Sequence, residues 1–420
     1  MSSIENGEAG GRAPDEPAAP ITGEPKLPGE VRAWGFVSLC SDLAHETVTA
    51  ALPALLTGFG AAPIALGLVE GCSDGVALLA KLWGGRLADR LQRLKPIAAS
   101  GYALTALALP AIALAHTWPL VLALRAVGWL GRGLRAPLRD TLLARAVPTD
   151  RRGRAFGLER AMDQVGAVLA PLALVGLAAL SGSPQLAIAA ALVPGAASVL
   201  VLLLGVREHP RELDPGRAVH DRRAHLPPAC RSLLLAVTVF GCGDFAKTLI
   251  ILWALGSRPE WTPGGLLTAG ALLYAFYNAI TVLAAWSGGA LSDRVGRRNV
   301  LAVAYALGAG AALVPVIAQP GLPAALLALA ASGWLVGTEE AVERAAVADL
   351  APPELRGRAF GWLHALNGIG DLVASAGVGL LWTAAGPHVA FAAAAALMGT
   401  GTVLTALLPG RARWGWSAPS

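Results

Sequence analysis

Ionisable side chains inside long apolar stretches are the residues of this chain best suited to chemistry. Asp42, His45 and Glu46 lie within one such stretch, and Arg132 lies within another. A charged side chain at the centre of a bilayer costs on the order of 2.5–3.5 kcal/mol, so such residues usually face a cavity and have partners. Asp42 and Glu46 are four residues apart and share one helix face. These four residues are the predicted proton-coupling group.

The hypothesis for this group is that Asp42 and Glu46 pair with Arg132 or Arg135 and that one carboxylate takes up a proton. Desolvation favours the neutral form of a carboxyl group and a nearby arginine favours the charged form, so a movement that separates them switches the balance. The alternative is a static ion pair between two helices. His45 either titrates near neutral pH or acts as a hydrogen-bonded spacer. No metal site is predicted, because one helix rarely supplies a full set of ligands.

Further polar residues in apolar stretches are predicted to line a solute cavity. The candidates are Arg125, Arg132, Asp244, Lys247, Tyr274, Asn278, Glu339 and Glu340. Counted at about 1.5 Å of helix rise per residue, Arg132, Asp244 and Lys247 fall in one layer near the middle of the membrane. Tyr274 and Asn278 have the alternative role of hydrogen-bonding neighbouring helices. The arginines favour an anionic or zwitterionic solute, unless salt bridges consume them all.

Transmembrane helices must position these residues. The chain has 420 residues, of which 55% are hydrophobic and 15% are charged, whereas an average soluble domain carries roughly 25% charged residues. Apolar segments of about 20 residues, long enough to cross a bilayer core of about 30 Å, recur along the chain. This composition excludes a soluble enzyme, a disordered scaffold and a collagen-like chain. We therefore predict an all-α membrane protein with twelve transmembrane helices.

The predicted helices form two six-helix bundles. They span residues 33–57, 63–84, 97–115, 119–145, 154–179, 185–206, 232–256, 264–287, 299–318, 322–349, 357–382 and 387–409. The predicted domains are a disordered cytoplasmic tail at 1–32, an N-terminal bundle at 33–206, a cytoplasmic linker at 207–231, a C-terminal bundle at 232–410 and a cytoplasmic tail at 411–420. Basic residues concentrate in alternate connections, which under the positive-inside rule places both termini in the cytoplasm.

An internal repeat relates the two bundles. The segment GGRLADR at 84–90 matches GGALSDR at 288–294, and RGRAFG at 152–157 matches RGRAFG at 356–361. Both pairs have the same offset, since 288 − 84 and 356 − 152 equal 204. An even number of helices in each half gives both halves the same orientation. Two such bundles that rock around a midplane site form a known transporter arrangement.

The same offset pairs residues of opposite charge. Arg135 corresponds to Glu339, Arg139 to Glu343, and Asp140 to Arg344. In a pseudo-two-fold arrangement, equivalent helices face each other near their cytoplasmic ends. We predict a cross-bundle gate in which Arg135 or Arg139 meets Glu339 or Glu343 when the cytoplasmic side is closed. The alternative is that each residue pairs within its own half.

The repeated segment resembles a signature of the major facilitator superfamily, G-x-L-a-D-r-x-G-r-r. Its copies here are GGRLADRLQRLK and GGALSDRVGRR, with Gln92 in the first where Gly296 stands in the second. Residues 125–133 are similar to the R-x-x-x-G-x-G pattern of that family, and 166–171 resemble its antiporter motif. The resemblance covers about residues 33–409. It implies two bundles whose first, fourth, seventh and tenth helices line a central path.

The repeated signature is predicted to act as a gate. Its residues are Gly84, Gly85, Asp89, Arg90, Gly288, Gly289, Asp293 and Arg294. The glycines let helix ends approach closely, and each aspartate can lie at the positive N-terminus of a neighbouring helix or pair with arginine. The alternative is anchoring of the loops to lipid headgroups by arginine.

The predicted protein is a secondary active transporter of a bacterial inner membrane, not an enzyme. It moves a small polar solute by alternating access, coupled to protons, and is expected to be a monomer. Its expected partners are the lipid bilayer, the solute and protons, without nucleic acid, metal or cofactor. No G-x-x-x-x-G-K-[ST] loop exists to bind ATP. The alternatives are a drug or metabolite efflux antiporter, a non-transporting membrane receptor and a lipid-modifying membrane protein.

Overall fold

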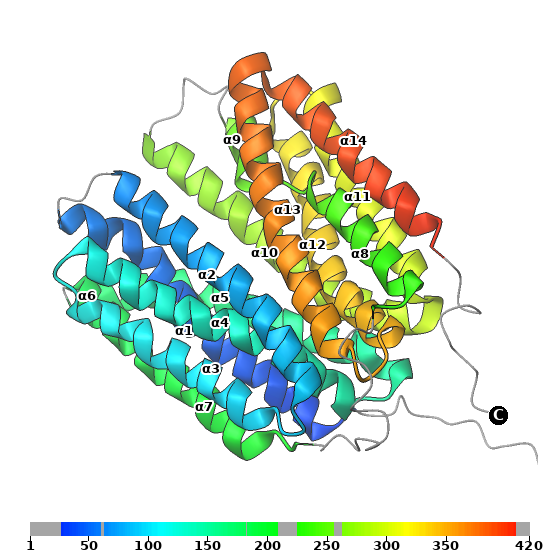
Figure 1. The fold of residues 1–420 in the computed structure, drawn as a ribbon. Coiled ribbons are helices and arrows are strands. Elements are labelled where there is room, and N and C mark those ends of the chain that lie inside the picture. Colours follow the sequence, from blue (N-terminus) through cyan, green and yellow to red (C-terminus); the bar gives the residue numbers. More distant parts are fainter. Residues whose placement is uncertain (1–26, 60–62, 182, 209–224, 256–262, 409–420) are drawn as a thin grey trace, which may run out of the picture.

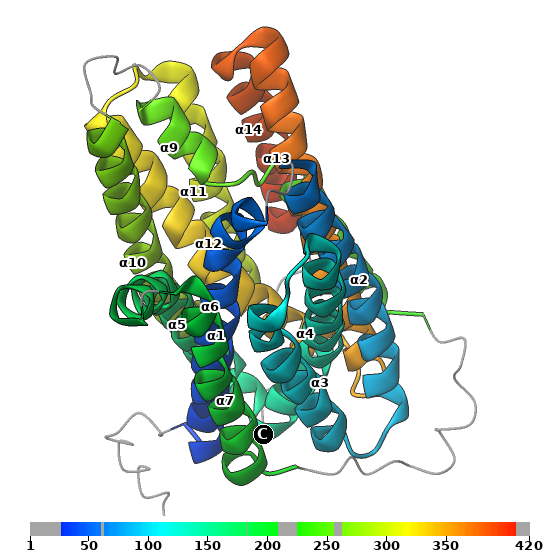
Figure 2. The same ribbon diagram turned by 90° about the vertical axis from the view of Figure 1, so that its left-hand side faces the viewer.

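The computed structural model describes residues 27–59, 63–181, 183–208, 225–255 and 263–408. Within these ranges the chain is almost entirely helical and contains no strand. Figures 1 and 2 show the helices gathered into two bundles, α1–α7 and α8–α14. The predicted fold class is confirmed. Most of the two predicted tails and of the predicted linker lies outside the described residues.

The N-terminal bundle contains seven α-helices and two short 3-10 turns among the described residues. Its elements are α1 (Gly29–Gly58), α2 (Pro63–Arg90), α3 (Lys95–Ala108), η1 (Pro110–Leu114), α4 (Trp118–Ala146), η2 (Thr149–Arg151), α5 (Arg152–Ser181), α6 (Pro184–Ala190) and α7 (Leu192–Gly205). The turn η1 continues α3, and α6 and α7 together form the predicted sixth span. The bundle thus has six spans.

The C-terminal bundle also has six spans in the described part of the chain. Its elements are α8 (Pro228–Gly241), α9 (Thr248–Leu255), α10 (Pro263–Val295), α11 (Arg297–Ile317), α12 (Leu322–Leu350), α13 (Arg356–Ala385) and α14 (Pro387–Ala406). Across both bundles, seven described segments are long and apolar enough to cross a membrane by length and composition.

The predicted seventh helix, 232–256, is not continuous. Helix α8 ends at Gly241 and α9 begins at Thr248, so the intervening residues, Asp244 and Lys247 among them, leave the helix. Irregular backbone at membrane depth is tolerated where it is buried in protein or lines a cavity. Residues of this break line two cavities described below. The sequence signal was the pair of glycines at 241 and 243, which favour a break.

The two copies of the repeated signature are helical rather than loops. Helix α2 runs on to Arg90 and α10 runs on to Val295, several residues beyond the predicted helix ends. The glycines of the signature therefore lie on helix surfaces. This placement lets them act in helix packing.

Small residues bring equivalent helix pairs close together in both bundles. A Cβ on Gly133 of α4 would collide with the carbonyl oxygen of Ala77 of α2, and one on Gly337 of α12 would collide with that of Thr281 of α10. Gly133 and Gly337 are again 204 residues apart. Small residues at helix interfaces in membranes permit such backbone contact. The repeat thus sets the packing inside each half.

Candidate functional site

The two halves touch at the end of the molecule that carries the repeated signature, which we name the motif end. Gly85 of α2 lies against Gly357 of α13, and a Cβ on Gly85 would lie 2.6 Å from the Gly357 carbonyl oxygen. The equivalent pair, Gly289 of α10 and Gly153 of α5, is equally close-packed. Backbone touches backbone across the interface at both places, so neither position has space for a side chain.

Each aspartate of the signature caps a helix of the opposite half. Asp89 Oδ2 accepts a hydrogen bond from the backbone N–H of Arg358, at 3.1 Å. Asp293 accepts hydrogen bonds from the backbone N–H groups of Gly153 and Arg154, both at 2.9 Å. A carboxylate at a helix N-terminus is stabilised by the unpaired N–H groups and the helix dipole. Arg90 and Arg294 lie in the last turns of α2 and α10.

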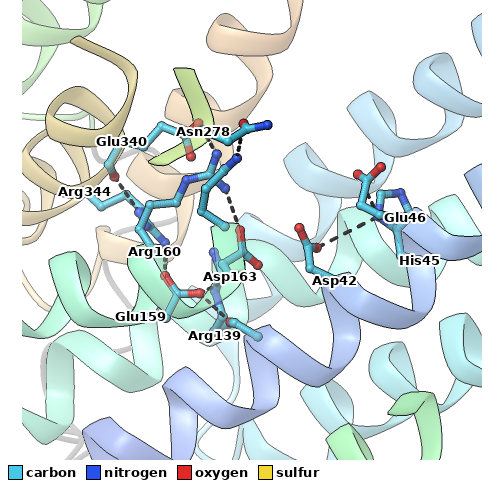
Figure 3. A network of polar contacts seen from close by, with 12 residues as sticks. Asp42, His45, Glu46, Arg139, Glu159, Arg160, Asp163, Asn278, Glu340 and Arg344 are labelled. Atoms are coloured by element: carbon cyan, nitrogen blue, oxygen red, sulfur yellow. Dashed lines mark hydrogen bonds and ion pairs between the residues drawn. The ribbon is translucent and has the colours of Figure 1, made fainter. Parts of the chain in front are cut away.

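A buried network of charges crosses between the halves next to the motif end (Figure 3). Arg344 of α12 pairs with Glu159 of α5 at 2.6 Å and with Asp140 of α4 at 3.5 Å. Arg139 contacts the same two carboxylates, Glu159 at 2.8 Å and Asp140 at 2.9 Å. His364 Nε2 of α13 lies 2.7 Å from the second Asp140 oxygen. Glu159 and Asp140 are fully buried, so the network excludes water.

A second cross-half pair lies beside this network. Arg160 of α5 binds Asp163 of its own helix at 2.5 Å and Glu340 of α12 at 2.7 Å. Figure 3 shows Arg160 between these two carboxylates. One guanidinium thus joins an anion of each half. Gln164 of α5 also donates a hydrogen bond across the interface, to Asn278 of α10 at 2.8 Å.

The predicted cross-bundle gate has the wrong partners in this conformation. Arg139 binds Asp140 and Glu159 of its own half, and Arg135 stacks over the ring of Tyr102 at 4.0 Å. Neither forms an ion pair with Glu339 or Glu343 within the described residues. The remaining opposite-charge pair of the repeat, Asp140 and Arg344, does bridge the halves. Asp140 is fully buried and does not line the cavity, whereas all four residues of the predicted gate do.

The proton-coupling candidates form one cluster on α1 and α4. Arg132 Nη1 lies 3.4 Å from Asp42 and 2.5 Å from His45 Nδ1. Glu46 lies 3.2 Å from the same imidazole nitrogen. The structure thus brings Asp42 to Arg132, whereas Glu46 contacts His45 rather than an arginine. Both helices belong to one bundle, so rigid rocking of the halves leaves this pair intact.

Asp42, His45 and Glu46 also resemble a metal site in their spacing. One ligand atom of each lies within 4.8 Å of the others. The guanidinium of Arg132 occupies the space beside Asp42 and His45 Nδ1, where a cation would bind. A positive charge at that position opposes divalent cation binding.

A cavity of about 330 Å³ lies between the halves, beyond the buried network. Residues of α1 to α5 form one wall, and residues of α8, α12, α13 and the break after α8 form the other. Charged side chains dominate both walls, and Asp42 and Arg132 belong to the first. A second cavity of about 330 Å³ adjoins the C-terminal wall, at the break between α8 and α9. The two cavities share Asp244, Glu339, Glu340 and Asp371.

The predicted cavity residues separate into two groups. Arg132, Asp244, Glu339 and Glu340 line the first cavity, and Lys247 and Tyr274 line the second. Lys247 binds Asp244 at 2.7 Å. Arg125 and Asn278 line neither cavity. Arg125 is buried in a 2.6 Å ion pair with Glu70, and Asn278 lies at the contact between the halves.

Sequence reasoning did not select several residues that the structure places at the site. Lys81 and Asp371 line the first cavity, and Glu159, Arg160 and Arg344 form the cross-half pairs. All five are charges within predicted membrane helices, which is the available signal. Which of them meet depends on helix rotation and on the contact between bundles, which a single sequence does not contain.

Known proteins share this architecture. The profile of the Major Facilitator Superfamily matches residues 34–288 and 233–415. An uncharacterised protein of Mycobacterium tuberculosis is 31% identical over 360 residues, covering 84% of this chain and 86% of that protein. Two solved structures have the same fold at low identity. They are a human organic anion transporter (TM-score 0.76, 17% identity, 91% and 100% coverage) and the E. coli fucose:proton symporter (0.72, 16%, 90% and 98%).

The profile match spans both halves, and the solved structures share their arrangement. The duplicated glycine–aspartate signature lies where the halves touch, and the charged cavity lies between them. On these grounds the chain belongs to the Major Facilitator Superfamily.

Proposed function

We propose that this protein carries a small polar solute across a bacterial inner membrane by alternating access, coupled to protons. As a member of its family it is a multi-pass membrane transporter, not an enzyme. The observation that carries the proposal is the ionisable cavity between the halves, with Asp42 and Arg132 on its wall. Protonatable carboxylates that face such a cavity are the usual parts of a proton pathway.

The closed motif end supports one step of the transport cycle. Under the positive-inside rule this end is cytoplasmic, because its connections carry the basic residues. Glycine contacts, capped helices and the buried network hold it shut, so the solute is expected to enter from the opposite side. Opening of the motif end must separate Arg344 from Glu159 and Arg160 from Glu340.

Proton coupling then has a physical basis in the cross-half pairs. Separating an ion pair inside a membrane leaves two uncompensated charges, which is costly. A proton on a carboxylate of this region removes one of those charges and lowers the cost of opening. Asp42 can take part through Arg132, because its protonation releases that guanidinium toward the cavity.

The test uses the purified full-length protein in proteoliposomes loaded with a pH-sensitive dye. Amino acids, organic acids and monosaccharides are added in turn, and proton movement is recorded. We expect at least one solute to move protons, and Asp42→Asn to abolish the dependence of uptake on the pH gradient. Asp150→Asn, an exposed residue outside the cavity, is the matched control. Undiminished dependence in both Asp42→Asn and Glu46→Gln would exclude this coupling group.

Two alternatives have distinct outcomes in the same vesicles. Efflux of apolar drugs is disfavoured, because charged groups dominate the cavity lining. A non-transporting receptor would bind its ligand yet show no counterflow of labelled solute against the unlabelled form. Counterflow therefore separates transport from reception.

A further inference from the structure

The two walls of the first cavity differ in charge. On the wall from the N-terminal half, five cationic side chains line the cavity with two anionic ones. On the wall from the C-terminal half, five carboxylates line it with one arginine. The repeat-related pair Arg135 and Glu339 illustrates this difference, since each lines the cavity from its own half. Arg139 and Glu343 show the same difference, so two repeat-related pairs present opposite charges to the same space.

Most of these charges are paired, and the exceptions are informative. Arg135 is 6% exposed and Glu339 is 9% exposed, yet neither has an ion-pair partner among the described residues. Arg135 stacks on the ring of Tyr102, which leaves the edge of its guanidinium without a carboxylate. Within the described ranges, the one hydrogen bond of Lys81 Nζ is long, 3.4 Å, and goes to the carbonyl oxygen of His364. Asp371 likewise forms no ion pair within the part of the chain described, whereas Glu343, which also lacks an ion pair there, accepts hydrogen bonds from Tyr305 and Asn367.

The charged side chains without an ion-pair partner differ in sign between the two walls. Arg135 and Lys81 are cations of the N-terminal half, and Glu339 and Asp371 are anions of the C-terminal half. Buried charges without partners are unfavourable, so a ligand that supplies both counter-charges gains the most binding free energy. An anion satisfies one wall only, a cation the other, and a neutral solute neither.

From this sorting we infer that the cavity binds a zwitterion, with its anionic group at Arg135 and Lys81 and its ammonium group at Glu339 and Asp371. The planar guanidinium of Arg135 suits a carboxylate, because it offers parallel N–H donors. A volume of about 330 Å³ is at the small end of the range for ligand pockets, about 300–1,000 Å³, and favours a solute of amino-acid size. This inference rests on the proposed function, because it names the class of solute that the transporter would carry. Its own claim concerns binding and not transport.

Such a solute bridges the two halves. Its carboxylate attaches to α2 and α4 and its ammonium group to α12 and α13, so binding draws the cavity walls together. A solute with a single charged group attaches to one half and provides no such link. Binding therefore favours the conformation that holds both charged groups best. Such a difference in affinity between two conformations is what allows a ligand to shift the equilibrium between them.

The first experiment compares solutes of matched size on the purified full-length protein. The probes are 5-aminopentanoate and norvaline as zwitterions, pentanoate as the anion and pentylamine as the cation. Thermal stabilisation reports binding, because a ligand that binds the folded state raises its stability. We expect at least one zwitterion to bind about tenfold or more tightly than either single-charge probe. Equal binding of a single-charge probe, or no binding of any probe at millimolar concentration, would overturn the inference.

The second experiment tests the orientation by a change of preference. The double variant Glu339→Gln, Asp371→Asn removes the anionic wall, and we expect its preference to move from zwitterion toward pentanoate. The double variant Arg135→Gln, Lys81→Gln should move it toward pentylamine. A misfolded variant loses all binding and cannot gain a new preference, and Asp150→Asn should keep the wild-type preference. Unchanged preferences in both folded double variants would also overturn the inference.

The two proposals fail separately. Zwitterion binding without counterflow contradicts the transport proposal and leaves the binding inference in place. Proton-linked counterflow of a single-charge solute, with no zwitterion bound, contradicts the binding inference and leaves transport in place.

Discussion

At the motif end, residues related by the 204-residue repeat make the same contact twice, whereas two such pairs in the cavity, Arg135 with Glu339 and Arg139 with Glu343, carry opposite charges. Gly85 meets Gly357 as Gly289 meets Gly153, and Asp89 caps α13 as Asp293 caps α5. In the cavity, Arg135 faces the same space as its counterpart Glu339. The comparison assigns two tasks to the two regions. The symmetric residues form the contact that opens and closes between the halves. The residues of opposite charge are the ones that we propose bind the solute.

The buried network between these regions is where one substitution should have the largest effect. Arg344→Met leaves Glu159 without its partner from the other half, and it leaves Asp140 with His364 as its remaining cross-half partner. Removing one member of a buried ion pair typically costs 3–5 kcal/mol, and we expect about 3 kcal/mol because Arg139 still faces both carboxylates. Denaturant unfolding of the purified protein measures the loss. The control is Arg151→Met, which removes a 3.6 Å ion pair with exposed Asp150 and should change the unfolding free energy by at most about 0.5 kcal/mol. A change in Arg344→Met no larger than that of the control would contradict the role of the network.

The symmetric glycines should have the next largest effect. Gly85→Ala places a Cβ 2.6 Å from the Gly357 carbonyl oxygen, and overpacking of this kind costs about 1–3 kcal/mol. The cost falls on the state with a closed motif end, so the population should move toward the state open there. Spin-label distances between α2 and α13 report this shift. Gly289→Ala should have the same effect, and an effect at only one position would show that the two glycine contacts are not equivalent.

Gly75 supplies the matched control for this experiment. It lies on α2 like Gly85, but a Cβ there would meet nothing within 4 Å. Gly75→Ala is therefore expected to leave the spin-label distances unchanged.

The aspartate caps should have the smallest effect. Asp89→Asn and Asp293→Asn keep the shape of the side chain but remove its charge at a helix N-terminus. A charge in this position contributes about 0.3–1 kcal/mol, so each variant should weaken closure by that amount. The spin-label distances used for the glycines measure it. Markedly unequal effects of the two variants would show that the two caps do not contribute equally to closure.

Composition and repetition were sufficient to predict most of the fold. Apolar segments of membrane-spanning length gave the twelve helices, and the offset between GGRLADR and GGALSDR gave the two halves. The break between α8 and α9 was missed, because hydrophobicity averaged over a window does not register a short irregular segment. The helical extension of α2 to Arg90 was missed because a polar helix end and a loop have similar composition.

The candidate site was predicted less completely than the fold. Charge inside apolar segments marked the relevant residues, Asp42, Arg132 and Glu339 among them. Their partners were not determined by that signal. Arg125 was expected in the cavity but binds Glu70 outside it, because it lies about two turns along α4 from Arg132, beyond the residues that line the cavity. Spacing along one helix defines a face, but it does not define what that face contacts.

The sequence alone determined that this chain is a duplicated membrane protein with charges at mid-depth, because hydrophobic length and repetition are properties of the chain itself. The tertiary structure decided which charges meet. It joined Arg344 to Glu159 across the halves, and among the residues it describes it left Arg135, Lys81, Glu339 and Asp371 around one cavity without an ion pair. The physical reason is that ion pairs form over a few ångströms, a distance fixed by how twelve helices rotate and pack rather than by residue order.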